Sequence, residues 1–322
     1  MSVSHLLVIA DPDAPHLKIL DKLGQNVLRT ISLDEQQLLS AAPDAEVILN
    51  CTGNGKLLRP VFLHAPRLQW VHSLAAGVEN QVFSELVDSP LPLTNSRGIF
   101  RESLGEFVLA AALFFAKDLR RMVRNQTAHR WEKFTVDEIS RQTMGIVGYG
   151  EIGKAAARRG KALGMRILGT RRKADPESRD DLADRIYPVG QMGEMIAQSD
   201  VIVVAAPLTS DTRGLVGKQE IAQMKETAIL VNVGRGPVID ELSLIEALTE
   251  KRIRGAALDV FDQEPLPEDH PFWSLENVLL SPHCADQTSD WLEQATEFFV
   301  TNLQRFLSGR PLLNIVDKHA GY

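Results

Sequence analysis

The chain has 322 residues, of which 44% are hydrophobic and 24% are charged, and its formal net charge at pH 7 is −7. Two domains of ordinary size account for this length, and each can bury a sizeable core. The negative charge argues against a nucleic-acid partner bound through a broad basic surface. No apolar run approaches the roughly 18 residues of a membrane helix, and the short run 6–10 lacks signal-peptide flanks. We therefore expect a cytoplasmic protein with neither a nucleic-acid nor a membrane partner.

The two cysteines, Cys51 and Cys284, are far apart in the chain. Neither belongs to a C-x-x-C pair or has a histidine at a metal-ligand spacing, so the sequence predicts no disulfide framework and no zinc site. We expect both thiols to be reduced and no metal to be bound.

The first hundred residues alternate short apolar strands with helical stretches. Strands are predicted at 6–10, 47–51, 68–72 and 91–95, and helices at 14–23 and 57–64. Strands that alternate with helices in this way indicate a parallel sheet. Beyond them, apolar side chains at helical spacing predict one unusually long helix over 103–124.

A glycine motif follows that helix. Gly148, Gly150 and Gly153 form G-x-G-x-x-G between an apolar strand and an alanine-rich helix. The first glycine permits a tight turn, the second lets a phosphate reach bare backbone, and the third lets the helix pack closely on the strand. The free N–H groups of the helix then face the anion. The motif in this context predicts a site for a dinucleotide, and a glycine-rich turn without a ligand is the alternative.

A second βα array completes the chain. Its predicted strands are 166–170, 200–205, 228–233, 255–260 and 277–280, and its predicted helices are 191–198, 219–224 and 241–249. A final helix is predicted at 289–307. We predict an α/β protein with two doubly wound parallel-sheet domains. A Rossmann dinucleotide-binding domain, residues 98–286, is inserted into a flavodoxin-like substrate-binding domain made of residues 1–97 and 287–322. A ligand would bind outside the carboxyl ends of the strands.

Three polar residues stand just beyond predicted strand ends of the second array. They are Arg235, Glu264 and His283. Hydride exchange at an alcohol needs a group that moves a proton near neutral pH, which suits a histidine. A carboxylate on its other ring nitrogen would hold the imidazolium, and an arginine would bind a substrate carboxylate. Singly, each has a plainer interpretation: a solvated loop arginine, a glutamate at a loop rim and a histidine that caps a strand.

These motifs together resemble the D-isomer-specific 2-hydroxyacid dehydrogenase family. The resemblance rests on the glycine motif, V-N-V-G-R-G at 231–236, L-D-V-F-D-Q-E-P-L at 258–266 and S-P-H at 281–283, in matching order and spacing. It implies an NAD(P)-dependent interconversion of a small 2-keto acid and a D-2-hydroxy acid, by a homodimer that pairs through the Rossmann domain. It makes Arg235 the substrate-binding arginine, His283 the acid/base, Glu264 its partner and Asp259 a carboxylate near the nicotinamide.

The resemblance extends to the binding loops. The stretch 73–79 resembles the loop whose N–H groups hold the substrate carboxylate, which implies Ala76 and Gly77, although Glu79 stands where an aspartate is usual. The stretch 206–209 is similar to a cofactor-flanking loop, or is a simple turn. The expected cofactor-binding residues are Gly148, Tyr149, Gly150, Glu151, Ile152, Gly153, Thr170, Arg171, Arg172, Ala206, Pro207, Val233, Gly234 and Asp259.

The end of the predicted strand 166–170, the next strand after the glycine motif, bears on the choice of cofactor. A carboxylate there accepts from the ribose hydroxyls of NAD, whereas an arginine pairs with the 2′-phosphate of NADP. The chain has Thr170-Arg-Arg-Lys173, with Arg171 18 residues beyond Gly153. We favour NADP, and a solvated basic strand end with NAD as cofactor is the alternative.

Some questions stay open at this stage. Trp131 resembles the family's tryptophan on a dimer arm that reaches the neighbouring active site, but an interface without that role fits it equally. A dinucleotide-sensing binding protein of the corepressor type is an alternative function, since fold does not dictate function. A dehydrogenase of a one-carbon or inorganic anion is another. The sequence leaves open which keto acid is the substrate.

Overall fold

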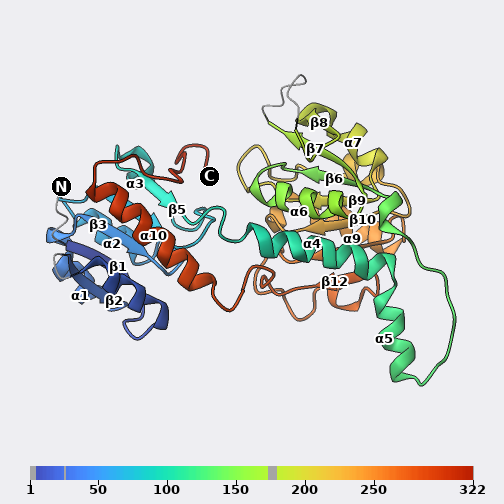
Figure 1. The fold of residues 1–322 in the computed structure, drawn as a ribbon, viewed down its shortest axis with the longest axis horizontal. Helices are drawn as coiled ribbons and strands as arrows, with labels where there is room; N and C mark the ends of the chain where they lie inside the picture. The colour runs from blue at the N-terminus through green and yellow to red at the C-terminus, as the bar shows by residue number, and fades with distance from the viewer. Residues whose placement is uncertain (1–4, 25–26, 173–179, 322) are drawn as a thin grey trace. The chain divides into compact units, whose positions relative to one another are not determined.

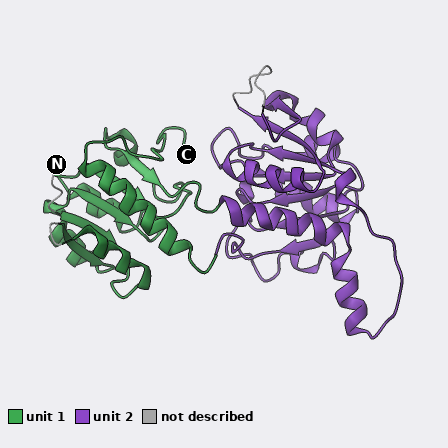
Figure 2. Ribbon diagram, viewed as in Figure 1, with its two compact units in different colours: residues 1–100, 288–322 green, residues 101–287 purple. Residues whose placement is uncertain are grey.

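The structure, a computed structural model, describes residues 5–24, 27–172 and 180–321. It divides into two compact units: Met1–Phe100 with Thr288–Tyr322, and Arg101–Gln287 (Figure 2). In each unit helices cover a parallel sheet (Figure 1). Within the described ranges, no helix combines the length and the apolar character that crossing a membrane requires.

The smaller unit has a five-stranded parallel sheet in the order β2-β1-β3-β4-β5, the flavodoxin-like order. The strands are β1 His5–Ile9, β2 Leu28–Ser32, β3 Val47–Asn50, β4 Trp70–Ser73 and β5 Leu93–Asn95. The helices are α1 Glu35–Ala41, α2 Leu58–Leu63, α3 Ser84–Asp88 and α10 Trp291–Leu307, with a 3-10 helix at Pro15–Leu23.

The strands β1, β3, β4 and β5 are buried on both faces, as is typical of apolar strands in a parallel sheet. The α10 helix, from the far end of the chain, covers one face, and its Phe299 stacks on Trp70 of β4 with ring centroids 5.4 Å apart. The two ends of the chain therefore share one core.

The larger unit has a seven-stranded parallel sheet in the order β12-β11-β10-β9-β6-β7-β8. The strands are β6 Thr143–Val147, β7 Arg166–Arg171, β8 Arg185–Pro188, β9 Val201–Val204, β10 Ile229–Asn232, β11 Gly255–Leu258 and β12 Val278–Leu280. The helices are α4 Arg101–Ala116, α5 Leu119–Thr127, α6 Glu151–Ala162, α7 Met192–Gln198, α8 Lys218–Ala222 and α9 Glu241–Thr249. Because the order reverses beside β6, this is the Rossmann arrangement, and the prediction of two doubly wound parallel sheets is confirmed.

The single long helix predicted over 103–124 is wrong. The α4 helix ends at Ala116, and Asp118 takes a left-handed conformation with φ 50°, which breaks the hydrogen-bond ladder. The Asp118 carboxylate then accepts from the N–H of Arg121 and caps α5. The apolar spacing continues across the break, so periodicity alone could not reveal it.

Other elements also differ from the prediction. The stretch Pro15–Leu23 is a 3-10 helix, and the strands β2 and β8 were not predicted. Both strands lie at sheet edges, where partly exposed side chains weaken the apolar signal.

Candidate active site

The glycine turn between β6 and α6 has the geometry that its motif predicts. Gly148 has φ 89°, and a Cβ atom there would lie 2.6 Å from the backbone nitrogen of Ala206. A Cβ atom on Gly153 would lie 2.8 Å from the carbonyl oxygen of Gly148. The α6 helix can therefore pack this closely on the turn only because residue 153 has no side chain. A Cβ atom on Gly150 would meet nothing within 4 Å, which leaves open space beside the turn.

The first turn of α6 can hold a phosphate, because its N–H groups have no partner within the helix. Ile152 is half-buried, and the exposed Glu151 pairs with Arg101 at 2.9 Å. Tyr149 is buried, and its hydroxyl donates to Asp180 at 2.8 Å. The tyrosine ring therefore packs inside the unit, and only its backbone belongs to the turn.

The end of β7 carries the two expected arginines. Arg171 donates from Nε to the Tyr149 carbonyl at 2.8 Å, and its guanidinium lies 5.1 Å from the centre of that ring. Among the described residues, its outer nitrogens have no hydrogen-bond partner. The adjacent Arg172 is exposed, Thr170 is buried, and Lys173 lies outside the described residues. The Arg171 fork can therefore still bind an anion.

The ends of β9 and β10 approach each other closely. A Cβ atom on Gly234 would lie 2.7 Å from the carbonyl oxygen of Ala206, so only glycine fits there. Ala206 and Val233 are buried, whereas Pro207 is exposed. These four residues line the same edge of the sheet as the glycine turn.

Arg235 follows Gly234 in a loop that is held by hydrogen bonds to the Asn232 side chain. The Asn232 side chain accepts from the N–H of Gly234 at 3.1 Å and donates to the carbonyl oxygen of Arg235 at 3.2 Å. A Cβ atom on Gly236 would lie 1.9 Å from a backbone atom of Phe261, so this glycine lets the loop pack against the segment that follows β11. Arg235 is thereby held near Glu264.

Glu264 and His283 form a hydrogen-bonded pair. Nδ1 of His283 donates to Oε2 of Glu264 at 2.7 Å, while Oε1 of Glu264 accepts from the N–H of Phe261 at 2.9 Å. Among the described residues, Nε2 of His283 has no hydrogen-bond partner. The carboxylate therefore fixes the ring and leaves one nitrogen free to exchange a proton.

The charges around this pair favour the imidazolium form. The hydrogen bond to Glu264 is the largest cause that raises the pKa of His283, against opposing effects of burial and of the Arg235 charge. Burial works against ionisation of Glu264, but the hydrogen bonds from His283 and Phe261, with the Arg235 charge, lower the pKa of its carboxyl group overall. Arg235 thus acts electrostatically on both members of the pair, and the three side chains form one cluster.

Asp259 is buried and anchors the loop that carries His283. Its Oδ1 accepts from the Ser281 hydroxyl at 2.5 Å and from the N–H groups of Cys284 and Ala285, both at 3.0 Å. Its backbone carbonyl accepts from the N–H of His283 at 2.9 Å. Sequence analysis missed Ser281 as a member of the site, although the S-P-H motif contains it.

The remaining predicted residues lie elsewhere. Ala76 and Gly77 are half-buried in the loop after β4 of the smaller unit. Trp131, in the segment after α5 of the larger unit, is 96% exposed.

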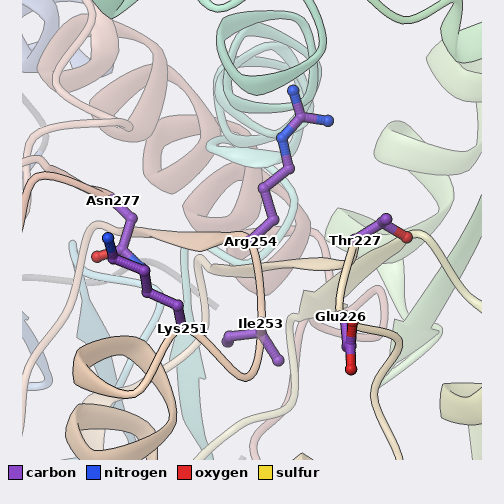
Figure 3. Close-up of a pocket in the computed structure, with 6 residues that line it drawn as sticks. All are labelled: Glu226, Thr227, Lys251, Ile253, Arg254 and Asn277. Atoms are coloured by element: carbon purple, nitrogen blue, oxygen red, sulfur yellow. The ribbon is translucent and has the colours of Figure 1, made fainter.

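A pocket at the opposite edge of the larger sheet contains none of these residues. It has a volume of about 360 Å³, and Figure 3 shows its lining, Glu226, Thr227, Lys251, Ile253, Arg254 and Asn277. Several of these residues directly precede β10, β11 and β12, whereas the cluster follows the carboxyl ends of the strands. Substrates of such folds bind at the carboxyl ends.

A Rossmann sheet with a glycine turn and a histidine–carboxylate pair at its carboxyl edge defines a class of proteins, the dinucleotide-dependent dehydrogenases. The model of one family, D-isomer specific 2-hydroxyacid dehydrogenase, NAD binding domain, matches residues 109–285. The chain belongs to this family.

Individual relatives agree with this assignment. A glyoxylate reductase of Thermococcus gammatolerans is 36% identical over 267 residues, which cover 80% of this chain and 79% of that protein. A D-3-phosphoglycerate dehydrogenase of Methanocaldococcus jannaschii is 31% identical over 318 residues; the match covers 97% of this chain but spans only 59% of the relative. The crystal structure of a family member from Xanthobacter autotrophicus, in complex with NADPH and MES, is 29% identical with a TM-score of 0.83 and covers 99% of each chain.

Proposed function

We propose that the protein is an NADPH-dependent reductase of small 2-keto acids such as glyoxylate, hydroxypyruvate and pyruvate, and that it forms D-2-hydroxy acids. The observation that carries this proposal is the 2.7 Å His283–Glu264 hydrogen bond, within electrostatic reach of Arg235. This pair lies at the same edge of the sheet as the glycine turn, whose geometry fits a dinucleotide.

The three side chains have different roles in the proposed reaction. Arg235 binds the substrate carboxylate and polarises the adjacent carbonyl group. Nε2 of protonated His283 gives its proton to the carbonyl oxygen, and Glu264 stabilises the imidazolium before that transfer. A nicotinamide cofactor held at the glycine turn would supply the hydride that the carbonyl carbon receives. In the smaller unit, the N–H groups of Ala76 and Gly77 bind the substrate carboxylate.

The arginines at the end of β7 favour NADP over NAD. Arg171 offers a guanidinium whose outer nitrogens have no partner among the described residues, and Arg172 adds a second exposed positive charge. A guanidinium fork matches the geometry of a phosphate group.

A homodimer through the larger unit also belongs to the proposal. Large apolar side chains are exposed on α5 and on the segment after it: Leu119, Met122, Val123, Trp131 and Val136. Burial of these side chains in a partner would explain their exposure. Light scattering after gel filtration is expected to give twice the mass of the chain, and Trp131→Ala is expected to weaken the association.

Both cysteines are free thiols, and we propose a cytoplasmic location.

A single spectrophotometric panel tests the activity. NADPH or NADH is incubated with glyoxylate, hydroxypyruvate and pyruvate, and NAD or NADP with formate and phosphite. We expect NADPH oxidation with at least one keto acid and a lower rate with NADH. Turnover of formate or phosphite alone would favour a dehydrogenase of small anions instead. Tight NADPH binding without any turnover would favour a dinucleotide-sensing binding protein.

A further inference from the structure

The loop after β4 is held by two side-chain amides that sequence analysis did not single out. The Asn95 amide donates from Nδ2 to the carbonyl oxygen of Ala76 at 2.6 Å. The Gln81 amide donates from Nε2 to the carbonyl oxygen of Gly77 at 3.2 Å. Two successive carbonyl groups of the loop are thus bound by side chains.

The carbonyl group before them is bound as well. The Ala75 oxygen accepts from the N–H of Ser96 and from the hydroxyl of Ser73, both at 3.2 Å. Three consecutive peptide carbonyls in this loop are therefore directed at groups of the protein.

These contacts fix the direction of the N–H groups. In a trans peptide the C=O of one residue and the N–H of the next point in opposite directions. Since the carbonyls of residues 75–77 are held, the N–H groups of Ala76, Gly77 and Val78 point away from the residues that hold them. Within the described part of the chain, no group accepts a hydrogen bond from these three N–H groups. Successive backbone N–H groups that have no partner in the protein can bind an anion.

The two anchoring amides are themselves fixed. Gln81 is 0% exposed; its Oε1 accepts from Asn50 at 2.9 Å and its Nε2 also donates to Ser73 at 2.7 Å. Asn95 is 4% exposed, and its Oδ1 accepts from the N–H of Arg97 at 3.2 Å. Neither amide can rotate without losing a buried hydrogen bond.

We infer that Gln81 and Asn95 are positioning residues for the substrate carboxylate. They hold the peptide planes of the loop so that its N–H groups are oriented before the substrate arrives, which lowers the entropic cost of binding. This inference rests on the proposed function, because it assigns the loop the keto-acid carboxylate as its ligand.

The test replaces the anchors with apolar side chains of similar size, Asn95→Leu and Gln81→Met. The matched control is Asn302→Leu, because Asn302 is also 0% exposed and its side chain bonds both the N–H and the carbonyl of Leu313. It lies in the same unit, and both of these side-chain hydrogen bonds go to Leu313 and not to the loop after β4. All three variants should lower Tm. Only the two anchor variants should raise the KM for glyoxylate, by about tenfold, and weaken inhibition by oxamate similarly.

The pattern of kinetic changes separates positioning from folding. A purely structural role would lower the active fraction, and hence the apparent kcat, with KM unchanged. We expect the KM for NADPH to stay at its parental value in every variant. Should Gln81→Met fail to fold, Gln81→Glu keeps the oxygen that Asn50 binds and removes the donor to Gly77.

The outcomes also distinguish the two proposals. If the parental enzyme reduces glyoxylate and both anchor variants keep its KM, the inference about Gln81 and Asn95 is wrong and the function stands. An equal rise of KM in Asn302→Leu would overturn the inference too. If the parental enzyme reduces no keto acid, the proposed function fails, and the inference fails with it.

Discussion

The two units use polar side chains in opposite ways, as a histidine in each unit shows. His283 of the larger unit is partly exposed and bonded to Glu264, which raises its pKa. His72 of the smaller unit is fully buried beside Thr94, and burial lowers its pKa to about 3. The first can hold and release a proton near neutral pH, whereas the second stays neutral. The environment, and not the residue type, decides which histidine can do acid–base chemistry.

The contrast extends beyond the histidines. The larger unit presents ionisable side chains at its strand ends, while the smaller unit buries its amides and presents backbone N–H groups. Substitutions in the first unit should therefore change the chemical step directly. Those in the second should change stability, or binding through the position of a loop.

The largest effect is expected for His283→Gln. Loss of a general acid typically costs 10²–10⁴ in rate, so kcat for glyoxylate reduction should fall by about that factor. NADPH affinity, measured by fluorescence titration, should remain. The matched control is His270→Gln, because His270 also pairs with a carboxylate, Glu241, at 3.1 Å. Parental turnover by the His283 variant would show that the acid is another group.

A smaller effect is expected for Glu264→Gln, about 10- to 100-fold in kcat. Reduction requires protonated His283, so its rate declines as pH rises through the pKa of that histidine. Since the hydrogen bond to Glu264 raises this pKa, its loss should move the decline to lower pH. The pH profile of kcat/KM measures the shift. Glu241→Gln should leave the profile in place, and an unmoved profile in Glu264→Gln would contradict the assignment.

The Arg171→Ala substitution tests whether the larger unit selects NADPH over NADH through this arginine. Loss of a charged hydrogen-bond donor to phosphate should raise the KM for NADPH about tenfold and leave the KM for NADH unchanged. Arg166→Ala is the control, because Arg166 occupies the other end of the same strand and is exposed. Equal changes for both cofactors would argue that Arg171 does not meet the 2′-phosphate.

The smallest kinetic effect is expected for His72→Phe, which should leave kcat and KM at neutral pH unchanged. This substitution should instead change how the stability of the protein depends on pH. The folded protein resists protonation of His72 down to about pH 3, whereas the unfolded chain takes up the proton below about pH 6.5. Stability should therefore fall with pH in this window, by about 1.4 kcal/mol per unit from this group. Phenylalanine, placed among Trp70, Phe298 and Phe299, should remove that contribution. Denaturant melts at several pH values test it, and an unchanged slope would refute it.

Short sequence motifs made the site residues of the larger unit predictable. The strict steric demands of Gly148 and Gly153 and the short stretches around Glu264 and His283 are local in sequence, so residue spacing reveals them. Asp118 illustrates the limit. Its left-handed conformation ends one helix and starts another, while the apolar pattern on both sides continues, so the pattern alone predicted a single helix.

In the smaller unit the sequence indicated a loop but not what holds it. Gln81 and Asn95 look like ordinary polar residues near strand ends. They become anchors only because β5 lies beside β4 and because the turn at 79–81 brings the Gln81 amide to Ser73 and Gly77.

The sequence by itself determined most of the alternation of strands and helices, the glycine turn and the residues able to transfer a proton, because these depend on contacts between near neighbours in the chain. Tertiary structure alone decided the protonation behaviour of each histidine and the orientation of the loop N–H groups. Both depend on burial and on hydrogen bonds between strands brought together by the sheet, and neither leaves a periodic trace in the order of residues.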